Sequence, residues 1–596
     1  NICVKLGAIK AADALITAEM SRAEAVARIQ SDPIGLEIMW SRLVNVVEEM
    51  WLTVCRTAFS LVIAEAQDFA CELLDKDGET LAHSPRAMPV FNLTLPRAVK
   101  ALLKAYPAET LKPGDVLITN DPWLCAGHLF DIAIVTPAFR NGRLVGLMGT
   151  VGHVSDIGGT KDSLHAREIY EEGLQIPPMK IFDAGVPNET LINMISRNVR
   201  NGEQVLGDIF SFVAANKLGA ERLDAFMHDY GMHDLSALAE VVQGLSEKAM
   251  RDAIRALPDG DYRSTITNNP LGEKITYPVL VKVEGDRITV DFDGAPPQLP
   301  QGGLNATLNY TAAHATYPLK CMLTPTVRGN AGCYRPFTVK APEGSILNPT
   351  YPAAVNLRTR TGWYLAPNIF RALAQAAPDK VQSFTGLAVA ANVYGQDQDG
   401  QFYSDLLFCG GGQGGSDRKD GHSSLLWPTS AANTSIELME SRVPVLVLEK
   451  AFLADSGGAG RTRGGLGQVV RFRKRDEDGL EMLVSVYPEG VDNPIAGLFG
   501  GEAGGGARGL VQGADGRLLR DCGTGALVSL HTTDQVVELV LGGGAGFGDP
   551  DERDHAAVAR DLARGYVTPE HVQRHYQNTA VPTGKRAEPE PSTVWA

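Results

Sequence analysis

The sequence predicts a mixed α+β protein with several domains, in which an N-terminal α/β region precedes a helical middle and a β-rich C-terminal half. One observation is size, because a chain of 596 residues should divide into about three or four units, each with its own hydrophobic core. Another is periodicity, which becomes mostly helical near residue 191 and changes to short alternating strands from residue 261. A third is the composition, 44% hydrophobic and 21% charged, which is typical of globular proteins.

These changes of pattern divide the chain into consecutive units, and no internal repeat is visible. The expected units are an N-terminal extension (1–31), an α/β region (32–189), a helical segment (190–260), a β-rich region with glycine-rich loops (261–550), and C-terminal helices with a disordered tail (551–596).

The first half of the chain alternates between helical and strand patterns. A peripheral helix is expected before about residue 31, and Asp32-Pro33 then begins a long core helix that extends to about Phe59. We further expect a strand over 69–74 with a turn at 75–78, a helix over 93–106, a buried strand over 115–119 and helices through most of 191–257.

The second half is expected to consist mainly of strands separated by glycine and proline turns. The expected elements are strands over 288–292 and 402–408, a helix over 554–564, a further short helix, and a disordered end from about residue 582.

The overall charge excludes some classes of partner. A net charge of −15 argues against nucleic acid and anionic membranes, and no apolar stretch approaches the ~20 residues that span a bilayer. The first residues lack a charged start and a clean apolar core, so no signal peptide is expected. The eight cysteines are scattered without a CxxC pair, as in reduced cytoplasmic proteins. We therefore expect a cytoplasmic protein.

The most informative stretch, residues 120–159, contains the pattern of a β-hairpin. Apolar runs over 132–135 and 144–151 flank Arg140-Asn141-Gly142-Arg143, and Asn-Gly is the strongest short hairpin signal. Three side chains of metal-ligand type, His128, Asp131 and His153, lie near the open end of this hairpin.

The register of the hairpin decides whether these ligands meet. In a perfect ladder Phe130 lies opposite His153 and Asp131 opposite Gly152, so Asp131 and His153 would project from opposite faces. Pro137 cannot donate to the ladder and predicts a β-bulge, which would shift the register by one residue.

His128, Asp131 and His153 are the predicted catalytic and metal-binding residues. Two neutral imidazoles and a carboxylate suit a divalent metal that keeps an open coordination position, the usual arrangement in catalysis. Asp156 belongs to the same cluster of ligand-type residues, although it is equally suited to capping a turn.

Other candidate residues have simpler interpretations. Asp121 in Asn-Asp-Pro is a turn former before it is a ligand. Cys125 fits a buried bystander thiol better than a nucleophile or soft ligand. His571 and His575 lie one helical turn apart in a charged segment, where a solvated helix face is the better interpretation.

The glycine-rich segments do not form a nucleotide-binding fingerprint. The GxGxxG within 409–416 follows a strand, but no helical pattern comes after it, and 542–548 does not fit the motif. We interpret both segments as tight turns or close backbone approaches. Since G-x4-G-K-[ST] is also absent, any ATP would bind to another polypeptide.

The chain resembles the hydantoinase B/oxoprolinase family in collinear order from about Asp32 to Tyr576. The resemblance rests on AEAQDFACELLDKDGETLAHS, LKPGDVLITNDPW, AGHLFDIAIVTPAF, GHVSDIGG, REIYEEGLQIPPMK, RNVRNGEQVLGDI, EGSILNP, DSGGAGRTRGGLG, GLFGG and GGGAGFGDP. Residues before Asp32 and the proline-rich tail fall outside it.

The resemblance implies a subunit that works with a hydantoinase A-type, actin-like ATPase in a hetero-oligomer. The partner would bind ATP and Mg and phosphorylate a small-molecule substrate, and the B-type subunit would complete the conversion. The family's divalent metal (Mn, Zn or Fe) is held by residues that match Asp68, His128, Asp131 and His153. Of these, Asp68 is indicated by the resemblance alone.

The resemblance favours ATP-dependent hydrolysis of cyclic amides of the hydantoinase, oxoprolinase or lactamase type. The alternatives are a subunit of an acetone- or acetophenone-type carboxylase, a non-catalytic scaffold, and a free-standing metallo-amidase. Arg358 and Arg360 are candidate anion contacts or, equally, surface charges.

Overall fold

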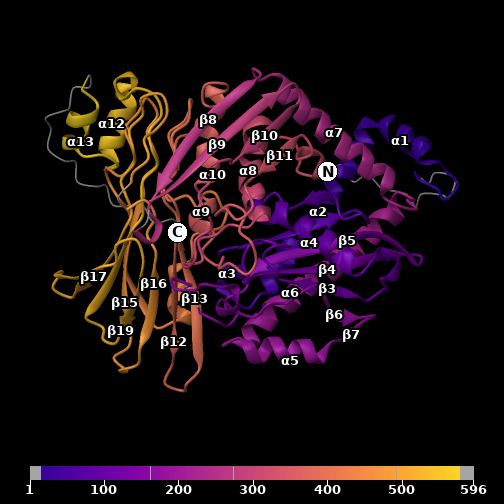
Figure 1. Ribbon diagram of the computed structural model, residues 1–596, viewed down its shortest axis with the longest axis horizontal. Coiled ribbons are helices and arrows are strands. Elements are labelled where there is room, and N and C mark those ends of the chain that lie inside the picture. Colours follow the sequence, from indigo (N-terminus) through magenta and orange to yellow (C-terminus); the bar gives the residue numbers. More distant parts are fainter. Residues whose placement is uncertain (1–14, 161–162, 273, 492, 578–596) are drawn as a thin grey trace, which may run out of the picture.

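The computed structural model describes residues 15–160, 163–272, 274–491 and 493–577. Figure 1 shows a mixed α/β architecture, with the N-terminal part (indigo to magenta) on one side and the C-terminal strands (orange to yellow) on the other. Among the described residues, none of the helices has the length and apolar character needed to cross a bilayer. The disordered end expected for the chain, like residues 1–14 of the expected extension, lies outside the described residues.

The N-terminal part is built on a seven-stranded antiparallel sheet with the order β2-β1-β5-β4-β3-β6-β7. Its strands are β1 (Phe69–Leu74), β2 (Thr80–His83), β3 (Val116–Thr119), β4 (Asp131–Arg140), β5 (Arg143–His153), β6 (Met179–Asp183) and β7 (Val186–Pro187). The strands predicted over 69–74 and 115–119 are confirmed, the second of them beginning one residue later.

Helices cover both faces of this sheet, since alternate strand residues point to opposite sides. One face packs against α2 (Pro33–Thr57) and α6 (Gly202–Asp229), and the other packs against α4 (Pro89–Ala105). The expected long core helix is α2, which begins at Pro33 with the Asp32 carboxylate accepting from the Gly35 N–H at 2.9 Å. The expected peripheral helix is α1 (Arg22–Gln30), and the short α3 (Leu61–Ala64) leads into β1.

The helical middle of the chain packs on the sheet. It consists of α5 (Glu189–Asn198), α6 and α7 (Ser236–Arg255), as the pattern over 191–257 predicts. A buried amide ties α6 to two strands: Asn216 accepts from the Thr150 hydroxyl at 2.7 Å and donates to the Ile134 carbonyl at 3.0 Å. The 190–260 segment therefore shares its core with the sheet.

The next part of the chain combines a small sheet with buried helices. Strands β8 (Gly260–Asn268), β9 (Ile275–Glu284), β10 (Arg287–Asp291) and β11 (Phe337–Lys340) form a sheet in the order β11-β10-β9-β8. Helices α8 (Leu308–Leu323), α9 (Thr359–Gly362) and α10 (Leu365–Leu373) follow or interrupt it. The region expected to be β-rich over 261–550 thus also contains helices. The sequence pattern does not reveal α8, because that helix is buried on nearly all sides and lacks the polar face that produces helical periodicity.

Two further sheets form the C-terminal half and share one hydrophobic core. The first has the order β13-β12-β16-β19 and the second β14-β15-β20-β17-β18. Their strands are β12 (Val389–Gln396), β13 (Phe402–Cys409), β14 (Val445–Phe452), β15 (Gln468–Lys474), β16 (Met482–Val486), β17 (Arg508–Gly513), β18 (Leu518–Asp521), β19 (Ala526–Leu530) and β20 (Gln535–Val540); α11 (Ile436–Arg442) precedes β14.

Glycine-rich segments next to these sheets pack backbone against backbone, which confirms the expected close approaches. The Gly412 N–H donates to the Gly542 carbonyl and the Gly544 N–H donates to the Gly465 carbonyl, both at 2.9 Å. A Cβ on Gly412 would lie 1.9 Å from the Gly465 oxygen, and one on Gly544 would lie 2.0 Å from the Gln413 oxygen. Only glycine fits these positions.

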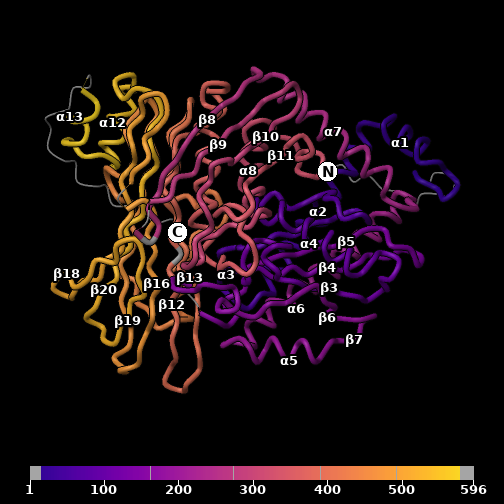
Figure 2. The backbone as a smooth tube through the Cα atoms, in the orientation of Figure 1, coloured from indigo at the N-terminus to yellow at the C-terminus, as the bar shows by residue number. Residues whose placement is uncertain are grey.

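This glycine core lies beside the two C-terminal helices, α12 (His555–Ala563) and α13 (Pro569–His575) (Figure 2). The segments that meet in it come from residues 383–386, 410–415, 456–467, 497–506 and 541–548.

Candidate metal centre

Three of the sequence-predicted ligands converge at one end of the β4–β5 hairpin. Asp131 is the first residue of β4, His153 is the last residue of β5, and His128 lies in the loop before β4. The Asp131 Oδ1 lies 2.8 Å from the His128 Nε2 and 3.3 Å from the His153 Nδ1. One ligand atom from each residue falls within 4.8 Å of the other two, which is the spacing a single ion requires.

A β-bulge produces this convergence, as Pro137 predicts. The turn pairs Arg140 with Arg143, but the register then shifts between Ala138 and Phe139, which leaves Val145 without a partner in the ladder. Asp131 consequently lies opposite His153, and the perfect-ladder pairing of Asp131 with Gly152 does not occur. Opposed residues of an antiparallel pair share a face, so the two side chains point to the same side.

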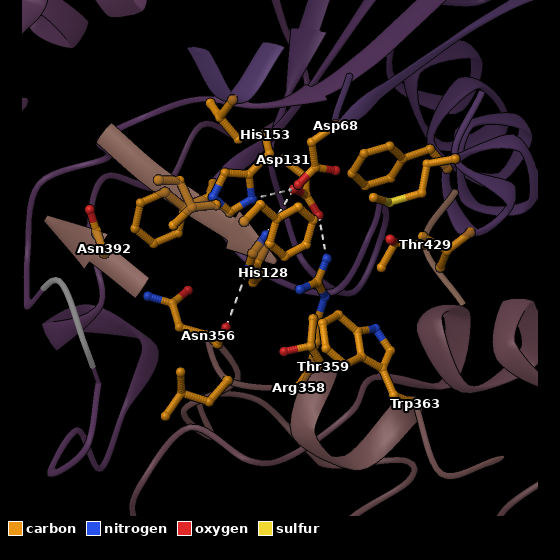
Figure 3. A pocket seen from close by; sticks show the side chains of 18 of the residues that line it. Asp68, His128, Asp131, His153, Asn356, Arg358, Thr359, Trp363, Asn392 and Thr429 are labelled. Atoms are coloured by element: carbon orange, nitrogen blue, oxygen red, sulfur yellow. Dashed lines mark hydrogen bonds and ion pairs between the residues drawn. The ribbon is translucent and has the colours of Figure 1, made fainter. Parts of the chain in front are cut away.

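Asp68, the ligand indicated by the family resemblance alone, lies beside this cluster. It directly precedes β1, and its backbone carbonyl accepts from the His153 N–H at 3.0 Å. Figure 3 shows its carboxylate next to Asp131 and His153. Among the described residues the buried Asp68 Oδ1 has no hydrogen-bond partner, and burial raises the pKa of this carboxyl to about 6.

Arg358, whose role the sequence left open, is a buried partner of the cluster. Its Nη2 lies 2.5 Å from the Asp131 Oδ2, and its Nε donates to the Ala126 carbonyl at 2.7 Å. The guanidinium carbon lies 4.2 Å from the ring centre of Tyr310. Burial alone would raise the pKa of Asp131, but His128 and Arg358 outweigh it and lower that pKa, so the carboxylate is ionised.

His128 is oriented by a backbone carbonyl from the same distant loop. Its Nδ1 lies 3.1 Å from the Asn356 oxygen, an acceptor that requires the proton on Nδ1 and leaves the Nε2 lone pair for a metal. Burial, with Arg358 nearby, lowers the pKa of His128 to about 4, so the imidazole is neutral at physiological pH.

The donor set fits a divalent transition metal or zinc. It offers two imidazoles and one ionised carboxylate at mutually compatible positions, and Asp68 has a buried oxygen that lacks any partner. An oxygen in that state pays a desolvation penalty that a cation would remove.

The cluster forms one wall of a cavity with an empty volume of about 1140 Å³, part of which is open to solvent. The N-terminal sheet contributes the ligands, while Arg358, Thr359 and Trp363 approach from the opposite side (Figure 3). The remaining walls combine aromatic side chains, namely Phe91, Phe130, Tyr310, His314, Phe408 and Tyr487, with polar ones, namely Ser155, Asn392, Ser404, Asp405, Thr429 and Ser485. Such a shape and lining are typical of a small-molecule site.

Asp156 and Asp121 do not join the cluster. Asp156 is fully buried and pairs with Arg200 at 2.7 Å, and Asp121 accepts from the Trp123 N–H at 2.9 Å in a turn. Cys125 is buried, and burial raises its thiol pKa, which makes it a poor nucleophile.

Three further candidates also lie away from the cluster. His571 and His575 face Asp455 and Glu502 across a separate cavity, so the expected solvated helix face is wrong for them. Arg360 is buried against Glu489 and is no surface charge.

Sequence reasoning missed Asn356, Tyr310, His314 and Trp363 as parts of this site. Each comes from a segment more than 150 residues after His153, and none belongs to a ligand-type motif. The only signal that pointed toward this region was the pair of arginines, Arg358 and Arg360.

Comparisons with known proteins agree with this fold. The family model for hydantoinase B/oxoprolinase matches residues 32–550. A protein of Pseudomonas sp. (strain NS671), provisionally named as the B-type subunit of a D-/L-hydantoinase, is 30% identical over 579 residues, which cover 91% of this chain and 95% of that protein. The chain therefore belongs to the hydantoinase B/oxoprolinase family.

Two solved structures share its architecture. The crystal structure of the ATP-dependent caprolactamase from Pseudomonas jessenii matches with a TM-score of 0.83 and 26% identity, covering 93% of this chain and 98% of that one. The nucleotide-free structure of an acetone carboxylase matches with a TM-score of 0.81 and 19% identity, covering 93% and 81%. The second likeness concerns the fold alone.

Proposed function

We propose that this chain is the B-type, metal-binding subunit of an ATP-dependent hydrolase that opens cyclic amides. The observation that carries the proposal is the convergence of His128, Asp131 and His153 in a cavity of small-molecule size. A non-catalytic scaffold would have no need of an intact set of ligands.

The relatives support the reaction class. One has the name of a hydantoinase subunit, and another is an ATP-dependent caprolactamase, so both act on cyclic amides by name. The word "subunit" in the first name supports a partner chain for this protein too. The fold likeness to acetone carboxylase does not distinguish hydrolysis from carboxylation, so carboxylation remains the second candidate.

A partner of the actin-like ATPase class would bind ATP and Mg, since neither glycine-rich segment forms a nucleotide-binding motif. Phosphorylation of the amide oxygen by that partner removes the amide resonance and creates a good leaving group. Water then adds to the activated carbon, and the carbon–nitrogen bond breaks as the nitrogen takes up a proton, which leaves an acyl phosphate. A second water hydrolyses the acyl phosphate to the carboxylate and inorganic phosphate.

This chain's residues would hold the metal and the reacting carbon. Asp68, His128, Asp131 and His153 would be the ligands, and a divalent ion held there would supply activation of a water molecule near neutral pH. The Asn356 carbonyl keeps the proton of His128 on Nδ1, and the ion pair with Arg358 fixes the orientation of Asp131.

The test is turnover of hydantoin by the purified chain, by the partner, and by the two together, each with and without ATP. We expect ring opening only in the mixture that contains both chains and ATP. Turnover by this chain alone without ATP would show a free-standing amidase and contradict the two-subunit proposal. A requirement for bicarbonate and a ketone in place of the amide would favour the carboxylase.

A further inference from the structure

His314 is a buried histidine that has no hydrogen-bond partner on either ring nitrogen. It lies on α8 and is 2% exposed, and both Nδ1 and Nε2 lack a partner within the described part of the chain. Leaving a buried polar group unpaired destabilises the folded state. When such a group lines a cavity, a ligand that enters the cavity can pair with it.

The position of His314 makes it accessible to a ligand in the cavity. The side chain lines the same cavity as the candidate metal centre, and its ring centre is 4.4 Å from that of Tyr310, the ring that Arg358 covers. Gly362 leaves space for this arrangement, because a Cβ there would lie 2.3 Å from Tyr310 and 3.2 Å from the His314 Cδ2. The imidazole thus belongs to the aromatic wall and not to the metal cluster.

The chemistry of His314 restricts what it can bind. Burial, with Arg358 nearby, lowers its pKa to about 3, so the ring is neutral and offers one donor and one acceptor. A neutral ring pairs with a carbonyl or an N–H group and adds no charge to attract a carboxylate. The aromatic neighbours favour a flat, mainly apolar body around that group.

We propose that His314 determines specificity by pairing with a second polar group on the substrate ring, one that is not the amide bond to be opened. The inference rests on the proposed function, because it takes the substrate to be a cyclic amide bound at the metal centre. A ring with an additional carbonyl or N–H, as in hydantoin, satisfies His314, whereas a simple lactam of the same size leaves the imidazole unpaired. Sites of this kind reject analogues that lack the polar group.

The experiment compares dissociation constants for hydantoin and 2-pyrrolidinone, two five-membered rings, by calorimetry with the full chain loaded with the metal it retains on purification. We expect the wild-type chain to bind hydantoin about tenfold more tightly than 2-pyrrolidinone. His314→Phe, which keeps a flat ring and removes both nitrogens, should bind the two compounds equally within about twofold. His314→Gln, which retains a donor and an acceptor, should keep part of the preference.

Tyr317→Phe is the matched control. Tyr317 lies one turn further along α8, its buried hydroxyl also has no partner in the part of the chain that the structure describes, and it does not line the cavity. This variant should keep the full preference. His314→Phe should also unfold at a higher temperature than the wild type, because it removes an unpaired buried group.

A hydantoin preference that survives in His314→Phe would overturn the inference, while ATP-dependent turnover with the partner would leave the proposed function standing. An equal affinity of the wild-type chain for the two rings would overturn it in the same way. Failure of both rings to bind would also overturn the inference, while ATP-dependent ring opening in the mixture with the partner would leave the proposed function standing.

Discussion

Arg358 and Asp131 lie 227 positions apart in the sequence and form a buried ion pair with 2.5 Å between Nη2 and Oδ2. The side chains are 3% and 0% exposed. The pair fixes the central carboxylate of the candidate metal centre from the far side of the cavity. It therefore connects the N-terminal sheet to the loop before α9.

Replacing Arg358 should expose the cost of this buried charge. Arg358→Met leaves Asp131 without its cation, which we expect to destabilise the metal-free protein by about 3–5 kcal/mol. Added metal should restore part of that loss, since the ion compensates the same carboxylate. Thermal unfolding with and without metal is the measurement, and Arg371→Met on the exposed side of α10 is the control. Wild-type stability in metal-free Arg358→Met would show that the pair contributes nothing.

Removing one imidazole should release the metal. His128→Ala should lower metal content, measured by mass spectrometry after dialysis, at least about tenfold, because an essential ligand and its support from Asn356 are lost. Turnover should be abolished while association with the partner persists. His531→Ala, at an exposed position beside Ser529, should retain the wild-type metal content. If turnover survives in His128→Ala, the site is elsewhere.

Glu172 should make stability depend on pH. It accepts from the Val355 and Asn356 N–H groups at 2.8 and 3.0 Å, and burial raises its pKa to about 7, against 4.5 in an unfolded chain. Between pH 4.5 and pH 7 the Glu172 carboxyl therefore binds its proton more tightly in the folded protein than in the unfolded chain. The stabilising contribution is therefore fully present below about pH 4.5 and is lost as pH rises through 7, with a slope of up to about 1.4 kcal/mol per pH unit.

Glu172→Gln should remove this contribution to the pH profile. We expect its melting temperature, relative to wild type, to rise between pH 5 and pH 8. Glu189→Gln, on the exposed first turn of α5, is the control for loss of a carboxylate. Parallel profiles for the wild type and Glu172→Gln would contradict the prediction.

The glycine core should tolerate no side chain. In Gly544→Ala the new Cβ would lie 2.0 Å from the Gln413 carbonyl oxygen. The Cβ is fixed to the backbone and the oxygen belongs to it, so no rotamer change relieves the clash. We expect a loss of more than about 4 kcal/mol or failure to fold. Gly244→Ala is the matched control, because that exposed position in α7 has open space and should gain about 0.5–1 kcal/mol. Soluble Gly544→Ala with wild-type stability in urea would contradict the packing.

Local chemistry made the ligand end of the site predictable. Asn141-Gly142 identified the hairpin, and Pro137 identified the bulge that brings Asp131 opposite His153. Each of these signals acts over a few residues, so the sequence carries it directly. The unpaired residue itself, Val145, has no signature, because a bulge can form on either strand of a pair.

The opposite wall of the cavity could not be predicted, because tertiary packing alone brings it there. Asn356, Arg358 and His314 follow the ligands by more than 150 residues, and their roles depend on which loop meets which sheet. Helix α8 escaped detection because burial on nearly all sides removes the polar face that periodicity needs. The glycine segments showed that backbones approach closely but not which of them meet.

The hydrogen bond from His128 to the Asn356 carbonyl has a consequence for biosynthesis. The ribosome completes all four candidate ligands before it has made half the polypeptide, yet the loop that clamps two of them emerges some 200 codons later. A nascent chain paused between these two stages would expose the imidazoles and carboxylates before the contacts from Asn356 and Arg358 could form. We therefore expect the candidate centre to bind a metal ion tightly only after this loop has been synthesised and packed against it.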